Sequence, residues 1–276
     1  RSLVGNLNVG FFLVIVGLFM ALPLVYAISS SLKPLSELWD YPPKFLVQNP
    51  TLGNFRDLFS LMGDSWVPFS RYLGNTLIVA VVGTFGHVII SSLCAYALAK
   101  HKFPGSDAIF KIIVLSLMFS SAVTAVPSFF IMSKMGLVNT HGALILPAFA
   151  SSLGLYLMKQ FMETNVPDAI LEAARIDGAG EWYIFWKIVM PQVKPAWLTL
   201  VIFSFQGLWN MGASPYIYSE QFKTLNYAIS QITAGGIARS GSSAAATVVM
   251  MMVPILVFVI SQSNIIETMG SSGMKD

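Results

Sequence analysis

Charged residues are scarce in this chain. Asp, Glu, Lys and Arg make up 11% of its 276 residues, whereas they make up about a quarter of a soluble domain. Hydrophobic residues make up 55%, which excludes an ordinary soluble domain and indicates a protein with several membrane-spanning helices. The basic residues are spread among the predicted loops without a dense cluster, so we expect no nucleic-acid partner.

Cysteine is almost absent as well. The only cysteine, Cys94, excludes an internal disulfide and a cysteine-based metal site. Because Cys94 lies inside an apolar run, we expect it to be a small core residue.

The chain also lacks the residues and motifs that power or catalyse reactions in membranes. No Asp or Glu lies inside a predicted span, although carriers driven by protons or sodium usually need a buried ion site. A Walker-type glycine loop, an HExxH motif and a GxSxG motif are all absent from the sequence. We therefore expect no catalytic residue, no metal and no cofactor in this chain, and an energy source on a partner.

Six hydrophobic segments predict an all-α membrane protein with a single domain over residues 1–276. About 20 apolar residues are enough to cross a bilayer. In the fourth segment, Pro147 and Gly154 predict a bent or broken helix. The predicted spans are approximately 9–28, 73–99, 108–133, 142–161, 195–216 and 244–261.

The first span raises a second possibility, because Val25-Tyr26-Ala27 resembles the cleavage site of a signal peptide. Its apolar run is longer than the usual signal core of about 7–15 residues, which favours a retained helix. The basic cluster Lys100-His101-Lys102 directly follows the second span and indicates the cytoplasmic side. Counting spans from there predicts that both termini and the polar stretch 162–194 are cytoplasmic.

The polar stretch 162–194 has helical order of its own. Two short helices, about 168–176 and 181–189, are predicted around a turn at Asp177-Gly178-Ala179-Gly180. In the second helix the spacing i, i+3, i+4, i+7 predicts that four apolar side chains share one face. They are Trp182, Phe185, Trp186 and Val189. A polar helix-turn-helix with an apolar stripe suggests a docking surface, or packing against the protein's own spans.

This stretch resembles the coupling loop of bacterial ABC-importer permeases. The family pattern is Glu-Ala-Ala, three residues, Gly, nine residues, Ile, one residue and Leu-Pro. Met190 stands in place of the leucine, with a similar volume. The wider sequence Ile176-Asp177-Gly178-Ala179 is similar to the carbohydrate branch, in particular the second permease subunit of maltose-type importers. The matching residues are Glu172, Ala173, Ala174, Gly178, Ile188 and Pro191.

The resemblance implies a type I ABC-importer permease fold with cytoplasmic coupling helices, in the inner membrane of a bacterium. It implies a second homologous permease subunit, two ATPase subunits that hold ATP and Mg, an extracytoplasmic solute-binding protein and a carbohydrate substrate. By the same resemblance Glu172 contacts the ATPase, while Asp177 either contacts it or holds the turn. The alternatives are a permease of this superfamily for a non-sugar solute and, from other classes, a standalone channel or a membrane enzyme.

Aromatic and amide side chains in the fifth span are candidates for the solute path. Gln206, Trp209 and Asn210 lie within one helical turn, and such groups suit sugar rings and hydroxyls. Weaker candidates are Tyr156, Asn75 and His87. The alternative for all of them is packing and hydrogen bonding between helices.

Overall fold

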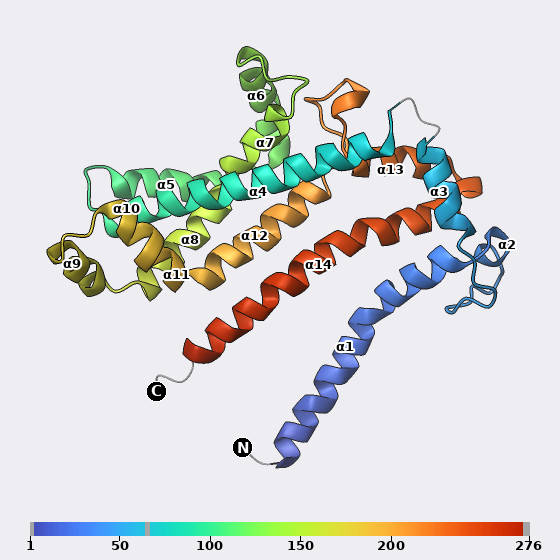
Figure 1. Ribbon diagram of the computed structural model, residues 1–276, viewed down its shortest axis with the longest axis horizontal. Coiled ribbons are helices and arrows are strands. Elements are labelled where there is room, and N and C mark those ends of the chain that lie inside the picture. Colours follow the sequence, from blue (N-terminus) through green and yellow to red (C-terminus); the bar gives the residue numbers. More distant parts are fainter. Residues whose placement is uncertain (1–2, 64–66, 273–276) are drawn as a thin grey trace. The chain divides into compact units, whose positions relative to one another are not determined.

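The computed structural model describes residues 3–63 and 67–272, and its regular elements in those ranges are all helices (Figure 1). The predicted all-α class is therefore confirmed. The chain forms two compact units, one from residues up to 69 together with 227–253, the other from residues 70–226 together with 254–276.

The first unit is organised around Asn54. Its side-chain amide donates to the carbonyl oxygens of Ser31 at 2.8 Å and of Lys33 at 2.7 Å, which satisfies acceptors at a helix end. A Cβ at Gly241 would lie 2.2 Å from Asn54 Oδ1, so glycine is needed for this close approach. The helices of the unit are α1 (Leu3–Leu32), α2 (Leu35–Leu38), α3 (Gly53–Gly63), α13 (Leu225–Thr233), η3 (Ile237–Arg239) and the start of α14 (Ser240–Ser272).

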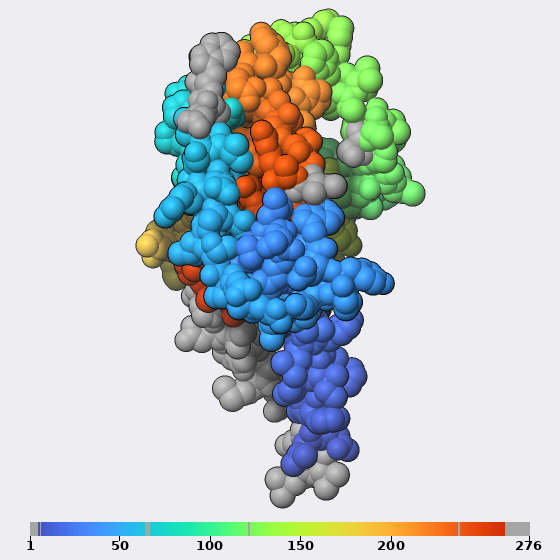
Figure 2. Space-filling model, turned by 90° about the vertical axis from the view of Figure 1, so that its right-hand side faces the viewer, coloured from blue at the N-terminus to red at the C-terminus, as the bar shows by residue number. Residues whose placement is uncertain are grey.

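Helix α1 presents apolar side chains to its surroundings along most of its length, including Phe11 and Phe19. In the surface view, the dark blue N-terminal part of α1 projects from the lighter blue segment that contains α2 and α3 (Figure 2). Such a helix is stable only in lipid or against another apolar surface.

The second unit is built on the long helix α4 (Phe69–Lys100). Its core includes Tyr96, Met158, Phe185 and Val193. The other helices are α5 (Ser106–Ser116), α6 (Ser121–Lys134), α7 (Gly142–Phe149), α8 (Ser152–Asn165), α9 (Asp168–Ile176), α10 (Glu181–Tyr183), the π-helix η1 (Ile184–Val189), α11 (Met190–Gln192), α12 (Lys194–Trp209), η2 (Glu220–Phe222) and the end of α14.

Glycines allow α4 to approach its neighbours closely. A Cβ at Gly83 would lie 2.5 Å from Leu208 of α12, and one at Gly154 of α8 would lie 2.0 Å from the His87 ring. Small residues at helix contacts are typical of membrane proteins. Cys94 lies on the exposed side of α4, so the prediction that it is a core residue is wrong. An apolar run alone does not distinguish a lipid-facing position from a buried one.

Four helices of the described residues are long and apolar enough to cross a membrane: Leu7–Leu32, Phe69–Lys100, Gly142–Asn165 and Ser240–Gln262. The pair Glu181–Gln192 and Lys194–Trp209, bent by 81°, can add a fifth. The third of these is broken between α7 and α8, as Pro147 and Gly154 predict. The total of six spans, with its boundaries, stays a prediction.

Candidate functional site

The segment between α8 and α12, residues 166–193, is named the coupling element here. Its first helix, α9, begins after Pro167, whose fixed φ suits a helix start. It ends at Ile176, and Gly178 in the following turn has φ +80°, a conformation that glycine adopts without strain. The Ala179 N–H donates to the Ala174 carbonyl at 2.9 Å and closes the turn. Both predicted helices are confirmed, at 168–176 and across α10 and η1 at 181–189.

The second helix differs from the prediction in the direction of its side chains. Phe185 and Val189 are buried, whereas Trp182 is 67% exposed and Trp186 43% exposed. The prediction that all four share one face is wrong, because residues 184–189 form a π-helix. A π-helix has more residues per turn than an α-helix, so the 3.6-residue period does not hold. Phe185 packs on Tyr96, with ring centroids 5.5 Å apart.

Glu181 links both coupling helices to the end of α4 through hydrogen bonds. Its carboxylate accepts from the Tyr96 hydroxyl at 2.7 Å and from Arg175 Nε at 2.8 Å, while His101 Nε2 lies 3.5 Å away. Arg175, and then Tyr96, lower the pKa of Glu181 by hydrogen bonding to its charged form. One side chain therefore joins α4, α9 and α10.

Lys100 makes a second link, from the end of α4 to the junction of α8 and α9. Its ammonium donates to the Val166 carbonyl at 2.6 Å and to Asp168 Oδ1 at 2.8 Å. The hydrogen bond from Lys100 also lowers the pKa of Asp168. From the sequence, Lys100 indicates only the cytoplasmic side. The hydrogen bonds of Lys100 and Glu181 were not predicted, because their partners are far apart in the sequence.

The exposed side chains of the coupling element include acidic and large apolar ones. Ile176 is 86% exposed and lies near the exposed side chains of Trp182 and Tyr183 in sequence. Glu172 and Ala173 are exposed, and no partner of the Glu172 carboxylate is found in residues 3–63 and 67–272. Of the other predicted coupling residues, Asp177, Gly178 and Pro191 are exposed, and Ala174 and Ile188 are partly buried.

The predicted solute-path residues occupy different environments. Gln206 is exposed on α12, and Asn210 is exposed directly after its end. Gln206 borders a cavity of about 190 Å³ that α14 also lines through Pro254 and Phe258. Trp209 is only 1% exposed and stacks on Phe205.

Asn75 and Tyr156 are held by neighbouring side chains and loops. The Asn75 amide donates to the carbonyls of Gln221 at 2.8 Å and Lys223 at 2.9 Å, and its oxygen lies 2.9 Å from His141 Nε2. Tyr156 stacks on Phe110, with ring centroids 6.0 Å apart. In this conformation Asn75 fixes a loop, and Tyr156 packs between α8 and α5.

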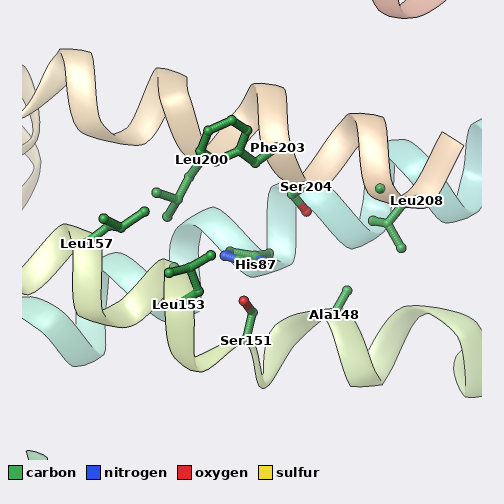
Figure 3. Close-up of a pocket in the computed structure, with 11 residues that line it drawn as sticks. His87, Ala148, Ser151, Leu153, Leu157, Leu200, Phe203, Ser204 and Leu208 are labelled. Atoms are coloured by element: carbon green, nitrogen blue, oxygen red, sulfur yellow. The ribbon is translucent and has the colours of Figure 1, made fainter. Parts of the chain in front are cut away.

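His87 borders a cavity of about 280 Å³ between α4, the α7–α8 break and α12. Figure 3 shows the ring between Ser151 on one side and Leu200 and Ser204 on the other. The His87 side chain is 6% exposed, and its Nε2 has no hydrogen-bond partner within the described ranges. Among the predicted path residues, His87 is the one with a buried side-chain polar atom that lacks a partner in the described part of the chain.

A family model described as "binding-protein-dependent transport system inner membrane component" matches residues 87–269. The chain belongs to this family. It is a permease of an ABC importer and lies in the membrane, as the coupling-loop pattern predicted. The family is not one of enzymes, since a partner ATPase hydrolyses the ATP, so the prediction that this chain is not an enzyme is confirmed.

The permease is similar to several characterised proteins. It is 30% identical to a diacetylchitobiose uptake permease of Streptomyces coelicolor, over 74% of this chain and 66% of that protein. It is 31% identical to an sn-glycerol-3-phosphate permease of Yersinia pestis, over 72% of each. It is 32% identical to an arabinooligosaccharide permease of Halalkalibacterium halodurans, over 74% of this chain and 71% of that one.

The fold of the permease matches a solved importer. A chain of a bacterial ABC transporter that imports alginate aligns with a TM-score of 0.77 and 21% identity, over 95% of this chain and 98% of that chain. The predicted ABC-importer permease fold is therefore confirmed.

Among the described residues, no three His, Cys, Asp or Glu side chains lie so that they could share a metal ion.

Proposed function

We propose that this permease is one half of a heterodimeric pore that imports a carbohydrate, with the coupling element docked on a cytosolic ATPase. The observation that carries the proposal is that Glu172, Ile176 and Trp182 of the coupling element are all exposed. An exposed apolar residue beside an unpaired carboxylate is typical of a surface that a partner covers. Ile188 and Pro191 complete the motif, and the partly buried Ala174 and the turn at Asp177 and Gly178 give the surface its shape.

The contacts of Glu181 and Lys100 support a transmission role for this surface. Both side chains bind the coupling element to α4, so a force on the element reaches a long membrane helix. Two ATPase subunits that hold ATP and Mg would supply the force. A second permease subunit would cover apolar helices such as α1, and a binding protein would deliver the solute.

The proposed orientation places both termini and the coupling element in the cytoplasm. Ile176 tests it, because its side chain is 86% exposed. In a Cys94→Ala background and with the permease produced without its ATPase, so that the docking surface is uncovered, we expect Ile176→Cys to react with a membrane-impermeant thiol reagent in inside-out vesicles and not in intact cells. Labelling in intact cells would reverse the orientation and remove the docking role.

The carbohydrate class rests on relatives whose names specify diacetylchitobiose and arabinooligosaccharides. The glycerol-3-phosphate relative supports a second candidate, a phosphorylated polyol. Gln206 of α12 and Asn210 directly after it are exposed and would line the solute path.

Glu172→Lys tests the docking role. We expect at least a tenfold loss of uptake and a weaker co-purification of the ATPase, because the substitution reverses the charge at the centre of the surface. Asp57→Lys, at an exposed carboxylate of α3, is the matched control and should leave both unchanged. Normal uptake by the Glu172→Lys transporter would refute the docking role.

The solute is identified with a panel of diacetylchitobiose, arabinotriose, an alginate trisaccharide and glycerol 3-phosphate. The readout is uptake into proteoliposomes that hold the whole transporter with its binding protein. Uptake of one of the three sugars is the expected result, and uptake of glycerol 3-phosphate alone would favour the second candidate.

A further inference from the structure

We propose that the cavity beside His87 holds a hydroxyl-bearing edge of the transported solute while the solute crosses the membrane. This inference rests on the carbohydrate class proposed above and names the place where this subunit touches the solute.

The first support is the unpaired ring nitrogen. The His87 ring is hydrogen-bonded to the backbone of Ala148, and its Nε2 has no partner in the described part of the chain. Ala148 is near the end of α7, where helix carbonyls lack intrahelical donors. A neutral ring that donates one nitrogen to that carbonyl has a lone pair on Nε2. In this conformation Nε2 is covered by Gly154 of α8, where an added Cβ would lie 2.0 Å away. A solute hydroxyl therefore reaches this acceptor when α8 moves away from the ring during transport.

The second support is the break between α7 and α8. Ser151 is at the break, and Ser204 is on α12 across the cavity. Both are partly exposed, and no hydrogen-bond partner of either hydroxyl is found in residues 3–63 and 67–272. Figure 3 shows the two hydroxyl oxygens on opposite sides of the histidine ring. Broken helices in transporters lie at solute sites, because their free polar groups can bind a solute.

The third support is the size and lining of the cavity. A water molecule takes about 30 Å³ of liquid, whereas this cavity has about 280 Å³. Leu157, Leu200 and Phe203 supply apolar walls. A few polar groups set in apolar walls are typical of a small-molecule site. A sugar edge meets both demands, since it offers hydroxyls beside C–H faces.

The fourth support is the depth of the site. His87 is 18 residues after Phe69 and 13 residues before Lys100, which are the ends of α4. At a rise of about 1.5 Å per residue, it lies roughly 27 Å from one end and 20 Å from the other. The cavity is therefore near the middle of α4 and far from both ends of this predicted span.

Gly207→Ala is the sharpest test variant. Gly207 lines the cavity, and a Cβ added there would meet no heavy atom within 4 Å. The substitution narrows the cavity without a clash, and alanine favours a helix more than glycine does. Gly74→Ala is the matched control, because Gly74 is also helical with open space around its Cβ position and does not line the cavity.

The histidine is tested by a pair of variants. His87→Leu removes the acceptor, whereas His87→Gln keeps one at a similar reach. Because a buried histidine substitution can harm folding, both are judged together with Gly207→Ala. The assay uses the whole transporter with its binding protein in proteoliposomes and the panel solute that the wild type imports.

We expect His87→Leu, which loses roughly one hydrogen bond to the solute, to lower the solute imported per ATP hydrolysed by about tenfold. Gly207→Ala, which narrows the cavity, should lower the same ratio by a similar factor. His87→Gln should lose less than threefold, and Gly74→Ala should match the wild type. A merely structural role would lower ATP hydrolysis in parallel and leave the ratio unchanged. A ratio within twofold of the wild type for both Gly207→Ala and His87→Leu would overturn the inference and leave the proposed function standing.

Thiol labelling gives an independent readout. In the Cys94→Ala background, Ser204→Cys should react with a cationic methanethiosulfonate in at least one nucleotide state, and the imported solute should slow the reaction about tenfold. Labelling that the imported solute does not slow would overturn the inference. A wild type that imports no member of the panel would instead overturn the proposed function. In that case the labelling of Ser204→Cys alone would test whether the cavity is a solute site. Reaction in one nucleotide state would support a solute site, and no reaction in any nucleotide state would count against it.

Discussion

The two ends of α4 are fastened in different ways. At the Phe69 end, Asn75 donates to two backbone carbonyls of the loop before α13, and Thr76 Oγ1 accepts from the Leu225 N–H at 2.8 Å. At the Lys100 end, the partners are the side chains of Glu181 and Asp168. The contacts of Asn75 and Thr76 join neutral, buried groups, although Tyr72 at the same end also donates to the Glu220 carboxylate. At the second end the carboxylates of Glu181 and Asp168 are 47% and 76% exposed, whereas the Lys100 side chain is only 5% exposed.

This difference has a consequence for movement. Buried amide contacts are expensive to break, because the freed groups find no substitute partner. Exposed ion pairs contribute little and exchange readily with water or a partner protein. We therefore expect the Asn75 end to remain fixed while the Lys100 end, which carries the coupling element, can shift when an ATPase moves it.

The largest effect is expected from Asn75→Ala. The substitution removes three hydrogen bonds at a site that is 2% exposed and should cost about 3 kcal/mol. Thermal unfolding of the purified transporter should occur at a lower temperature, with faster hydrogen exchange in residues 218–225. Asn165→Ala, which removes one exposed contact to Phe161, is the control and should change stability by less than about 0.5 kcal/mol. An equal effect of the two would show that the Asn75 end is not specially fixed.

An intermediate effect is expected from Lys100→Met. This change keeps the apolar stem and loses the contacts to Val166 and Asp168, at a cost of about 2 kcal/mol. Hydrogen exchange should speed up in residues 166–176 and not in 218–225. Lys102→Met is the control, since Lys102 is exposed and makes no such hydrogen bond in the described ranges. Unchanged hydrogen exchange in both variants would contradict the assignment that Lys100 links α4 to the coupling element.

The smallest effect is expected from acid. Because the pKa of Glu181 is lowered in the folded protein, its contribution is complete above the ordinary value of 4.5 and is lost as the pH falls through the lowered value. Asp168 behaves in the same direction. When the pH is lowered from 6 to 3.5, the hydrogen-exchange rate should rise in residues 166–183 and not in 218–225, after correction for the intrinsic pH dependence of exchange.

Glu181→Gln checks the source of that acid effect. It should reduce the pH dependence in residues 166–183 and cost at most about 1 kcal/mol, since the carboxylate is half exposed. If hydrogen exchange rose equally with acid at both ends of α4, the proposed difference between the two ends would be wrong. It would also be wrong if Glu181→Gln left the acid effect unaltered.

Local order was largely predictable from the sequence. The bounds 168–176 and 181–189 follow from proline, glycine and helical spacing, which act over a few residues. The broken fourth span follows from Pro147 and Gly154 in the same way. The family follows from the Glu172–Pro191 motif, whose spacing is long enough to be specific.

Burial was not predictable, because lipid and protein core both accept apolar side chains. Cys94 and Trp209 lie in similar apolar runs, yet Cys94 is exposed and Trp209 is buried. The π-helix at 184–189 divided the aromatic face that a 3.6-residue period predicted. Such a change of helical type is selected by packing against α4 and has no short-range signal in the sequence.

The sequence by itself determined an all-helical membrane protein with a coupling element and no catalytic motif, because composition, breakers and short-range spacing decide those features. Only the tertiary structure decided that Glu181 accepts a hydrogen bond from Tyr96, 85 residues away in the sequence. It also decided that both the amide nitrogen and the oxygen of Asn75 have hydrogen-bond partners. It alone left His87 Nε2 unpaired beside a cavity. Hydrogen bonds between distant residues depend on how the helices pack, and a linear pattern of hydrophobicity contains no record of that packing.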